Sequence, residues 1–227
     1  MDSPPSPRTG GATAPALALD GLCKAFGQKI AVNMLSLAVP PGSIYGMVGP
    51  NGAGKTTTLS MATGLLLPDA GRAVVHGIDV WDRPADAKAR LGVLPDGLRT
   101  FDRLSGRELL EFVARMHRLD IATARGRSEE LLVTLGLAGD ADTMVRDHSA
   151  GMTKKIGLAA ALVHNPRLLV LDEPFESVDP VSGETIREIL HRHTAGGGTV
   201  IMPSHVMGLV ETLCDRVAVT AGGRLLA

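Results

Sequence analysis

Residues 49–57 decide the fold, and they read Gly49-Pro50-Asn51-Gly52-Ala53-Gly54-Lys55-Thr56-Thr57. The stretch has the form Gly-x4-Gly-Lys-Thr. Its glycines let the backbone wrap around an anion and point N–H groups at phosphate oxygens. Lys55 adds a positive charge near the outer phosphates, and the Thr56 hydroxyl can ligate Mg²⁺. The sequence therefore predicts a loop that binds phosphates.

The flanking segments give this loop the context that it needs. Residues 44–48 read as a buried strand, and residues 57–62 read as the start of a helix. A helix N-terminus attracts anions through its free N–H groups and its dipole. The alternative, a plain glycine-rich turn, does not account for a strand on one side and a helix on the other.

Length and composition restrict the class of protein. The chain has 227 residues, enough for one large domain or two small lobes. Its net charge of −1 provides no excess of positive charge for binding DNA. Its aromatic content of 3% provides few side chains that could stack on the bases of a single-stranded nucleic acid. Cys23 and Cys214 form no C-x-x-C pair, which favours a reducing compartment over a disulfide framework or a zinc site.

The N-terminal segment differs from the rest of the chain. Residues 1–15 contain four prolines and lack the cationic start and apolar region of a signal peptide. We expect a flexible tail there and a folded domain over 16–227. No run of residues approaches 18 consecutive apolar positions, so the sequence predicts no membrane-spanning helix.

Strand and helix signals alternate along the folded part. Two short antiparallel strands are expected within 17–39, around a turn at 24–29. Further strands are expected, with helices between the later ones, at 72–76, 91–94, 168–171, 199–202 and 217–220. Alternation of this kind predicts an α/β fold with a mostly parallel sheet and an N-terminal antiparallel β subdomain.

The middle of the chain is helical in character. Ser105 and Glu108 fit a capping box, and apolar residues follow it at helical spacing, at Leu109, Phe112, Val113 and Met116. A second helix is expected over about 128–135, with Gly136 at its end. Residues of about 100–148 therefore form a predicted α-helical subdomain inserted in the α/β chain.

Two carboxylates follow the apolar run at 168–171. Asp172 and Glu173 lie at the C-terminal end of a predicted strand, where open α/β sheets bind ligands. An Asp at this place can hold Mg²⁺, and the adjacent Glu can polarise an attacking water. A solvated Asp-Glu pair is the alternative, but together with the phosphate loop both ends of a Mg-nucleotide site are present.

A third element begins at Ser149, a good N-cap for a helix of small and apolar residues. Taken alone, Ser149-Ala150-Gly151 is more simply an ordinary capped helix than a phosphate-binding helix start.

The order of these elements resembles the nucleotide-binding subunit of ATP-binding cassette (ABC) transporters. The phosphate loop is followed by Ser149-Ala150-Gly151, by Asp172-Glu173, by Ser177-Val178-Asp179 and by Ser204-His205. The resemblance covers nearly the whole chain from Leu17 and implies a P-loop NTPase core. The Ser-x-Gly-Met form at 149–152 is similar to the bacterial exporter branch that includes antibiotic-resistance and type-2 exporters.

The resemblance implies a role for each matching residue. Phe26 corresponds to an aromatic that stacks on adenine, and residues Gly49 to Thr57 cradle the phosphates. Thr56 and Asp172 organise Mg²⁺. Glu173 corresponds to the carboxylate that activates water, and His205 to the histidine that contacts the γ-phosphate.

The resemblance also implies partners. Ser149 and Gly151 complete the ATP site of a second subunit, a copy or a paralogue, and Asp179 corresponds to a loop that touches that subunit. The helical subdomain and the loop at Asp96 dock a transmembrane permease. The expected location is cytoplasmic, peripheral on the inner face of the cell membrane, with no nucleic acid bound.

Several positions depart from the family pattern. Asp96 stands where Gln is usual, and can still accept from a Mg-bound water, but with a shorter reach than the Glu common in the exporter branch. Met152 stands where the signature usually has Gln, which removes an amide from the contact between subunits. His191 and His193 are two residues apart on a predicted helix, so they lie on different faces and are expected to face solvent.

Two other functions fit parts of the sequence. A soluble ABC ATPase that acts on DNA or ribosomes usually carries a long coiled coil or two tandem cassettes, and this sequence has neither. A regulatory nucleotide-binding subunit with little hydrolysis is the second alternative. The presence of Lys55, Asp172, Glu173 and His205 favours an active Mg-dependent ATP hydrolase.

Overall fold

A computed structural model describes residues 14–95, 103–176, 178–205 and 207–227. Asp96, and all of the expected tail except Ala14 and Pro15, lie outside these residues. No helix in the described part of the chain is both long enough and apolar enough to span a bilayer.

The central sheet has six strands in the order β10-β9-β3-β8-β7-β6 and is parallel except for the β9–β10 pair. Its strands are β3 (Ile44–Val48), β6 (Leu91–Leu94), β7 (Leu168–Leu171), β8 (Thr199–Ser204), β9 (Arg216–Ala221) and β10 (Arg224–Leu225). Every residue of β3, β7 and β8 is buried, as expected for parallel strands covered on both faces. The predicted mostly parallel sheet is confirmed, and β10 is an additional edge strand.

The antiparallel sheet has the order β2-β1-β4-β5. Its strands are β1 (Leu17–Phe26), β2 (Lys29–Val39), β4 (Ala70–Val75) and β5 (Ile78–Asp79). The predicted antiparallel pair within 17–39 is confirmed, but the strands are longer than expected and leave only Gly27 and Gln28 as the turn. This long hairpin carries Phe26 at the end of β1.

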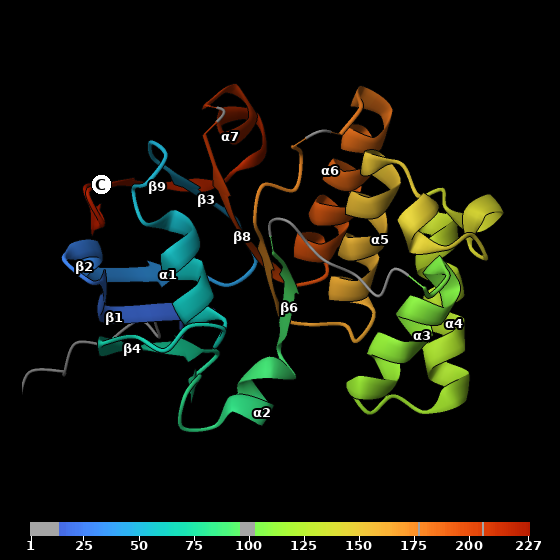
Figure 1. Ribbon diagram of the computed structural model, residues 1–227, viewed down its shortest axis with the longest axis horizontal. Helices are drawn as coiled ribbons and strands as arrows, with labels where there is room; N and C mark the ends of the chain where they lie inside the picture. The colour runs from blue at the N-terminus through green and yellow to red at the C-terminus, as the bar shows by residue number, and fades with distance from the viewer. Residues whose placement is uncertain (1–13, 96–102, 177, 206) are drawn as a thin grey trace, which may run out of the picture.

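Helices cover the central sheet on both faces (Figure 1). Helix α1 (Lys55–Ala62) shares a core with the antiparallel sheet and with Tyr45 and Met47 of β3. Helices α5 (Ala150–Leu162) and α6 (Pro180–Ala195) pack with the alternate residues of the same sheet, among them Ile44, Leu169 and Val200. The shorter helices are α2 (Pro84–Lys88) and α7 (Met207–Leu213).

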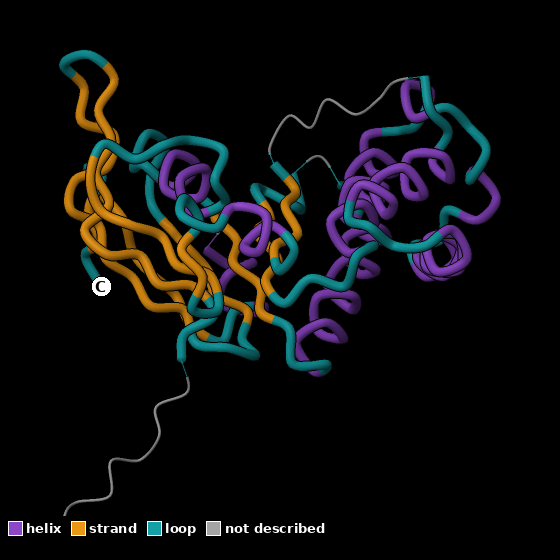
Figure 2. The backbone as a smooth tube through the Cα atoms, turned by 90° about the horizontal axis from the view of Figure 1, so that it is seen from below, coloured by secondary structure: helices purple, strands orange, loops and turns teal. Residues whose placement is uncertain are grey.

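The helical insertion lies on one side of the two sheets, as Figure 2 shows. It contains α3 (Gly106–Met116), α4 (Ile121–Thr134) and the short 3-10 helices η1 (Ala138–Asp140) and η2 (Val145–Asp147). The capping box of α3 is confirmed: Ser105 Oγ accepts from the Glu108 N–H, and a Glu108 carboxylate oxygen accepts from the Ser105 N–H. The prediction that the second helix begins near 128 is wrong. It begins at Ile121, because Asp120 is the N-cap of the helix and its side chain accepts from the Thr123 N–H.

The expectation that both histidines of α6 face solvent is wrong for His193. His191 is exposed, but His193 is half-buried under Gly198, where an added Cβ would lie 2.2 Å from the His193 Nε2. Burial lowers the pKa of His193. Because the chain folds back over α6 in the turn to β8, the imidazole is covered by backbone.

Candidate nucleotide-binding site

The phosphate loop joins the buried strand β3 to α1, and two of its glycines are required by the geometry. A Cβ on Gly49 would lie 2.2 Å from the Thr220 carbonyl oxygen of β9. Gly54 caps α1 with a φ of 95°, a left-handed conformation that L side chains rarely adopt. The loop therefore packs closely against the end of the sheet and leads directly into the N-terminus of α1.

Lys55 is the first residue of α1 and is 8% exposed. Its ammonium donates to the carbonyl oxygens of Gly49 at 2.7 Å and Pro50 at 3.1 Å. Among the described residues these neutral oxygens are the hydrogen-bond acceptors of Lys55 Nζ, and no carboxylate forms an ion pair with it. A buried ammonium without a carboxylate partner is well suited to receive an anion.

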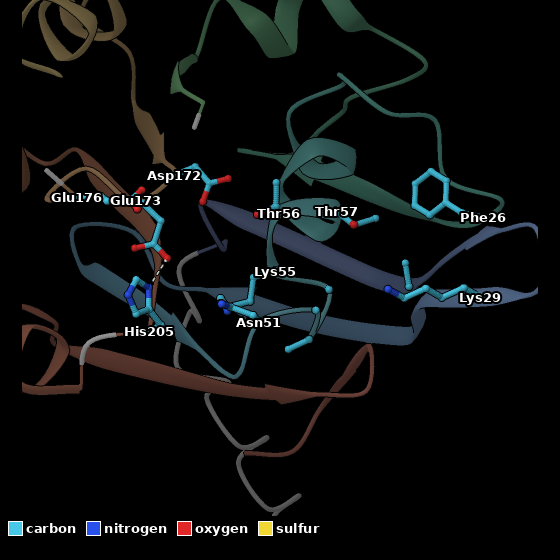
Figure 3. A pocket seen from close by; sticks show the side chains of 14 residues that line it. Phe26, Lys29, Asn51, Lys55, Thr56, Thr57, Asp172, Glu173, Glu176 and His205 are labelled. Atoms are coloured by element: carbon cyan, nitrogen blue, oxygen red, sulfur yellow. Dashed lines mark hydrogen bonds and ion pairs between the residues drawn. The ribbon is translucent and has the colours of Figure 1, made fainter. Parts of the chain in front are cut away.

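One cavity of about 440 Å³ brings most of the predicted site residues together (Figure 3). Its volume lies within the range of small-molecule sites. Its lining is drawn from the hairpin β1–β2, the phosphate loop with the start of α1, and the ends of β7 and β8. The lining residues are Phe26, Lys29, Ala31, Asn51, Gly52, Ala53, Gly54, Lys55, Thr56, Thr57, Asp172, Glu173, Glu176 and His205.

Three of these lining residues are not predicted from the sequence: Lys29, Ala31 and Glu176. Lys29 and Ala31 follow the turn of the hairpin, so the β1–β2 pairing brings them beside the cavity. Glu176 follows Glu173, and its N–H donates to the Glu173 carbonyl at 3.2 Å. The proximity of Lys29 to Phe26 and of Glu176 to Glu173 in the sequence was the only available signal.

Thr56 and Asp172 both line this cavity and also an adjoining cavity of about 250 Å³. Asp172 is 8% exposed, and its N–H donates to the Leu94 carbonyl at 2.7 Å, which fixes the residue at the ends of β6 and β7. A hydroxyl and a carboxylate are oxygen ligands of the kind that Mg²⁺ prefers, so this donor set fits the ion.

Glu173 and His205 are hydrogen-bonded at the ends of β7 and β8, with 3.0 Å between Glu173 Oε1 and His205 Nδ1 (Figure 3). Because an ionised carboxylate can only accept, the imidazole carries a proton on Nδ1. The Glu173 backbone has a positive φ of 46°, and its carbonyl accepts from Lys154 Nζ at 3.0 Å. Lys154 thereby holds the backbone of Glu173, and His205 holds its carboxylate.

Ser149 and Gly151 do not line the cavity. Ser149 caps α5, and its Oγ accepts from the Met152 N–H at 3.2 Å. A Cβ on Gly151 would lie 3.1 Å from Asp179 Oδ2, and Asp179 in turn caps α6. Within one chain, the structure places this cluster at the N-termini of α5 and α6, apart from the phosphate loop.

A glycine loop at a helix N-terminus, facing an Asp-Glu pair across a cavity, defines a P-loop nucleotide-binding site. Comparisons with known proteins identify the class more closely. The family model described as "ABC transporter" matches residues 32–176. The chain belongs to the ABC transporter family and is an ATP-binding subunit.

Individual relatives and structures agree with this family. The linearmycin resistance ATP-binding protein LnrL of Bacillus subtilis is 37% identical over 211 residues, covering 93% of this chain and 68% of the relative. The Nod factor export ATP-binding protein I of Ralstonia nicotianae is 37% identical over 230 residues, covering 100% of this chain and 70% of the relative. A solved ATP-binding subunit of an ABC transporter matches with a TM-score of 0.87 at 25% identity, over 93% of this chain and 88% of that one.

Proposed function

We propose that this subunit hydrolyses ATP in a Mg²⁺-dependent reaction to power a membrane transporter. The observation that carries the proposal is the Glu173–His205 pair, which lies across one cavity from Lys55 and the N-terminus of α1. The loop supplies an anion site, and the pair supplies a carboxylate oriented to accept a proton from water. Nucleotide binding and hydrolysis thus have their groups in the same cavity.

Each lining group has a role in the proposed reaction. The backbone of Gly49 to Thr57 and the Lys55 ammonium bind the phosphates, and Phe26 stacks on the base. Thr56 and Asp172 would hold Mg²⁺, and the ion would neutralise charge on the phosphate oxygens. Glu173 accepts the proton of the attacking water, while His205 orients the carboxylate through Nδ1 and has its other nitrogen available for a phosphate oxygen.

The complete site requires two subunits. Ser149 and Gly151 stand at the N-terminus of α5, where Ser149 is exposed outside the chain's own cavity. A helix start of this kind binds phosphate. We infer that it covers the nucleotide of a second ABC subunit, a copy or a paralogue, and that residues 16–227 act as one ATPase domain with a helical subdomain at about 100–148.

A mixing experiment tests the paired site. Lys55→Ala removes the cation that binds the phosphates, and Ser149→Arg blocks the N-terminus of α5. Each purified variant alone is therefore expected to lose ATP hydrolysis. In a mixture of copies, one site of each mixed dimer retains both Lys55 and Ser149. Activity should return to about a quarter of the wild-type value if the subunits pair isologously. Two inactive variants that stay inactive when mixed, although co-purification through two different tags shows mixed dimers, would refute the shared site.

Transport is the proposed use of the hydrolysis. The names of the relatives, a resistance protein and an export protein, favour an exporter whose permease contacts the cargo. In the described part of the chain, α3 exposes Phe112 and Met116, and residues of α3, α5 and β6 are among those that line a cavity of about 370 Å³. These apolar surfaces favour docking of a permease, with the subunit peripheral on the cytoplasmic face of the membrane and no nucleic acid bound.

Two alternatives predict different results. Co-purification of the tagged chain with nucleic acid or ribosomes, in place of a membrane protein, would favour a soluble ABC ATPase. A regulatory subunit would bind ATP and show no turnover with its partner, whether Glu173 is intact or replaced by Gln.

A further inference from the structure

The Phe26 ring has a cation on one side. Lys24 Nζ lies 5.9 Å from the centroid of the ring, within the range of a cation–π contact. Phe26 is 53% exposed and lines the large cavity, whereas the Lys24 side chain is only 15% exposed. The charged residue is thus the more buried of the two.

The position of the ammonium is fixed by two other contacts. Lys24 Nζ donates to Asp69 Oδ1 at 2.7 Å and to the Leu67 carbonyl at 2.8 Å. An ammonium has three N–H donors, so the third remains for the ring. The head group therefore cannot leave the ring without breaking an ion pair and a second hydrogen bond.

Asp69 also anchors the backbone next to the ring. Its Oδ2 accepts from the N–H of Ala25 at 2.8 Å, and its own N–H donates to the Cys23 carbonyl at 2.9 Å. These bonds tie the segment before β4 to the last residues of β1 on both sides of Lys24. The backbone at the end of β1 is thus fixed by hydrogen bonds next to Phe26.

We infer that Lys24 is a positioning residue that holds the Phe26 ring in the orientation that stacks on the purine base of the nucleotide. The inference rests on the proposed role of Phe26 as the base platform. Lys24 contacts the ring, and the ring contacts the base, so Lys24 acts on the base and not on the phosphates. Loss of Lys24 should weaken nucleotide binding. The rate at which the bound nucleotide is hydrolysed should not change.

The test uses the full-length chain with Lys24→Met, which keeps the aliphatic stem and removes the charge. ATP should bind about two- to fivefold more weakly, the range expected for an exposed cation–π contact. KM should rise by the same factor with kcat unchanged, and binding of inorganic tripolyphosphate, which has no base, should not change. Lys24→Arg should restore ATP binding, because it keeps a cation. Arg72→Met, which breaks the exposed Arg72–Asp20 pair of the same sheet, is the matched control and should bind ATP as wild type does.

Phe26→Leu distinguishes the proposed stacking of Phe26 on the base from the inferred positioning role of Lys24. If Phe26 is the platform, this variant binds ATP more weakly, by a factor of roughly ten, as loss of base stacking predicts. Adding Lys24→Met to it should then change nothing further. Wild-type affinity in Phe26→Leu would overturn the platform and the inference with it. Weak binding in Phe26→Leu with an undiminished effect of Lys24→Met in the double variant, or equal losses for ATP and tripolyphosphate, would overturn the inference alone.

Discussion

His164 makes this fold sensitive to acid. Its Nε2 lies 2.9 Å from the Leu91 carbonyl oxygen, so the neutral ring carries its proton on Nε2 and donates it. Nδ1 is buried and has no hydrogen-bond partner among the described residues. Burial, and then the charge of His117, whose ring stacks at 3.6 Å, lower the pKa of His164 from 6.5 to about 4. A proton added to Nδ1 would face the interior unpaired.

The sign and size of the effect follow from proton linkage. Above pH 6.5 neither state binds the proton, and the stability is fully present. As the pH falls from 6.5 toward 4, the unfolded chain binds the proton and the folded chain does not, so the free energy of unfolding decreases. Between pH 7 and pH 5 this group alone should remove about 2 kcal/mol.

Urea unfolding at pH 7 and pH 5 measures this loss. His164→Gln keeps an N–H donor near the Nε2 position and does not titrate, so its loss between the two pH values should be about 2 kcal/mol smaller than that of the wild type. His191→Gln changes an exposed histidine on α6 and should keep the wild-type loss. Equal losses in His164→Gln and the wild type would refute the assignment.

Three substitutions test the packing and capping of the fold by the same urea assay. Gly92→Ala places a Cβ 2.1 Å from the Ala161 carbonyl, and should destabilise the protein by about 2–3 kcal/mol; an unchanged midpoint would contradict the close packing of β6 on α5. Gly126→Ala, in the exposed interior of α4 with nothing within 4 Å, should instead stabilise it by about 0.5–1 kcal/mol, and destabilisation there would argue against the helix. Ser105→Ala removes the cap of α3 and should cost about 1 kcal/mol, whereas no loss would show that the capping box contributes little.

The elements of the fold that can be predicted from the sequence are those that depend on neighbouring residues in the chain. The strand before the phosphate loop and the run at Leu168–Leu171 are apolar at every position apart from Gly46, which is typical of buried parallel strands. The capping box at Ser105 depends on residues three apart, so it too can be read locally.

The parts that were missed depend on tertiary contacts. The first turns of α4 are rich in small and polar residues, lack an apolar period, and are stabilised by Asp120 and by packing on α3. His193 is half-buried only because the chain turns back at Gly198. Lys29 reaches the cavity through the length of the hairpin, which a pattern of short apolar runs does not reveal.

Phosphate release from ATP by wild type and by Glu173→Gln, in parallel with equilibrium ATP binding, tests the central claim most directly. The side-chain amide keeps the shape of the carboxylate but cannot accept the proton of water. Turnover should therefore fall by about 10²–10⁴-fold while ATP still binds. Equal, measurable turnover in the two proteins would contradict Glu173 as the group that activates water.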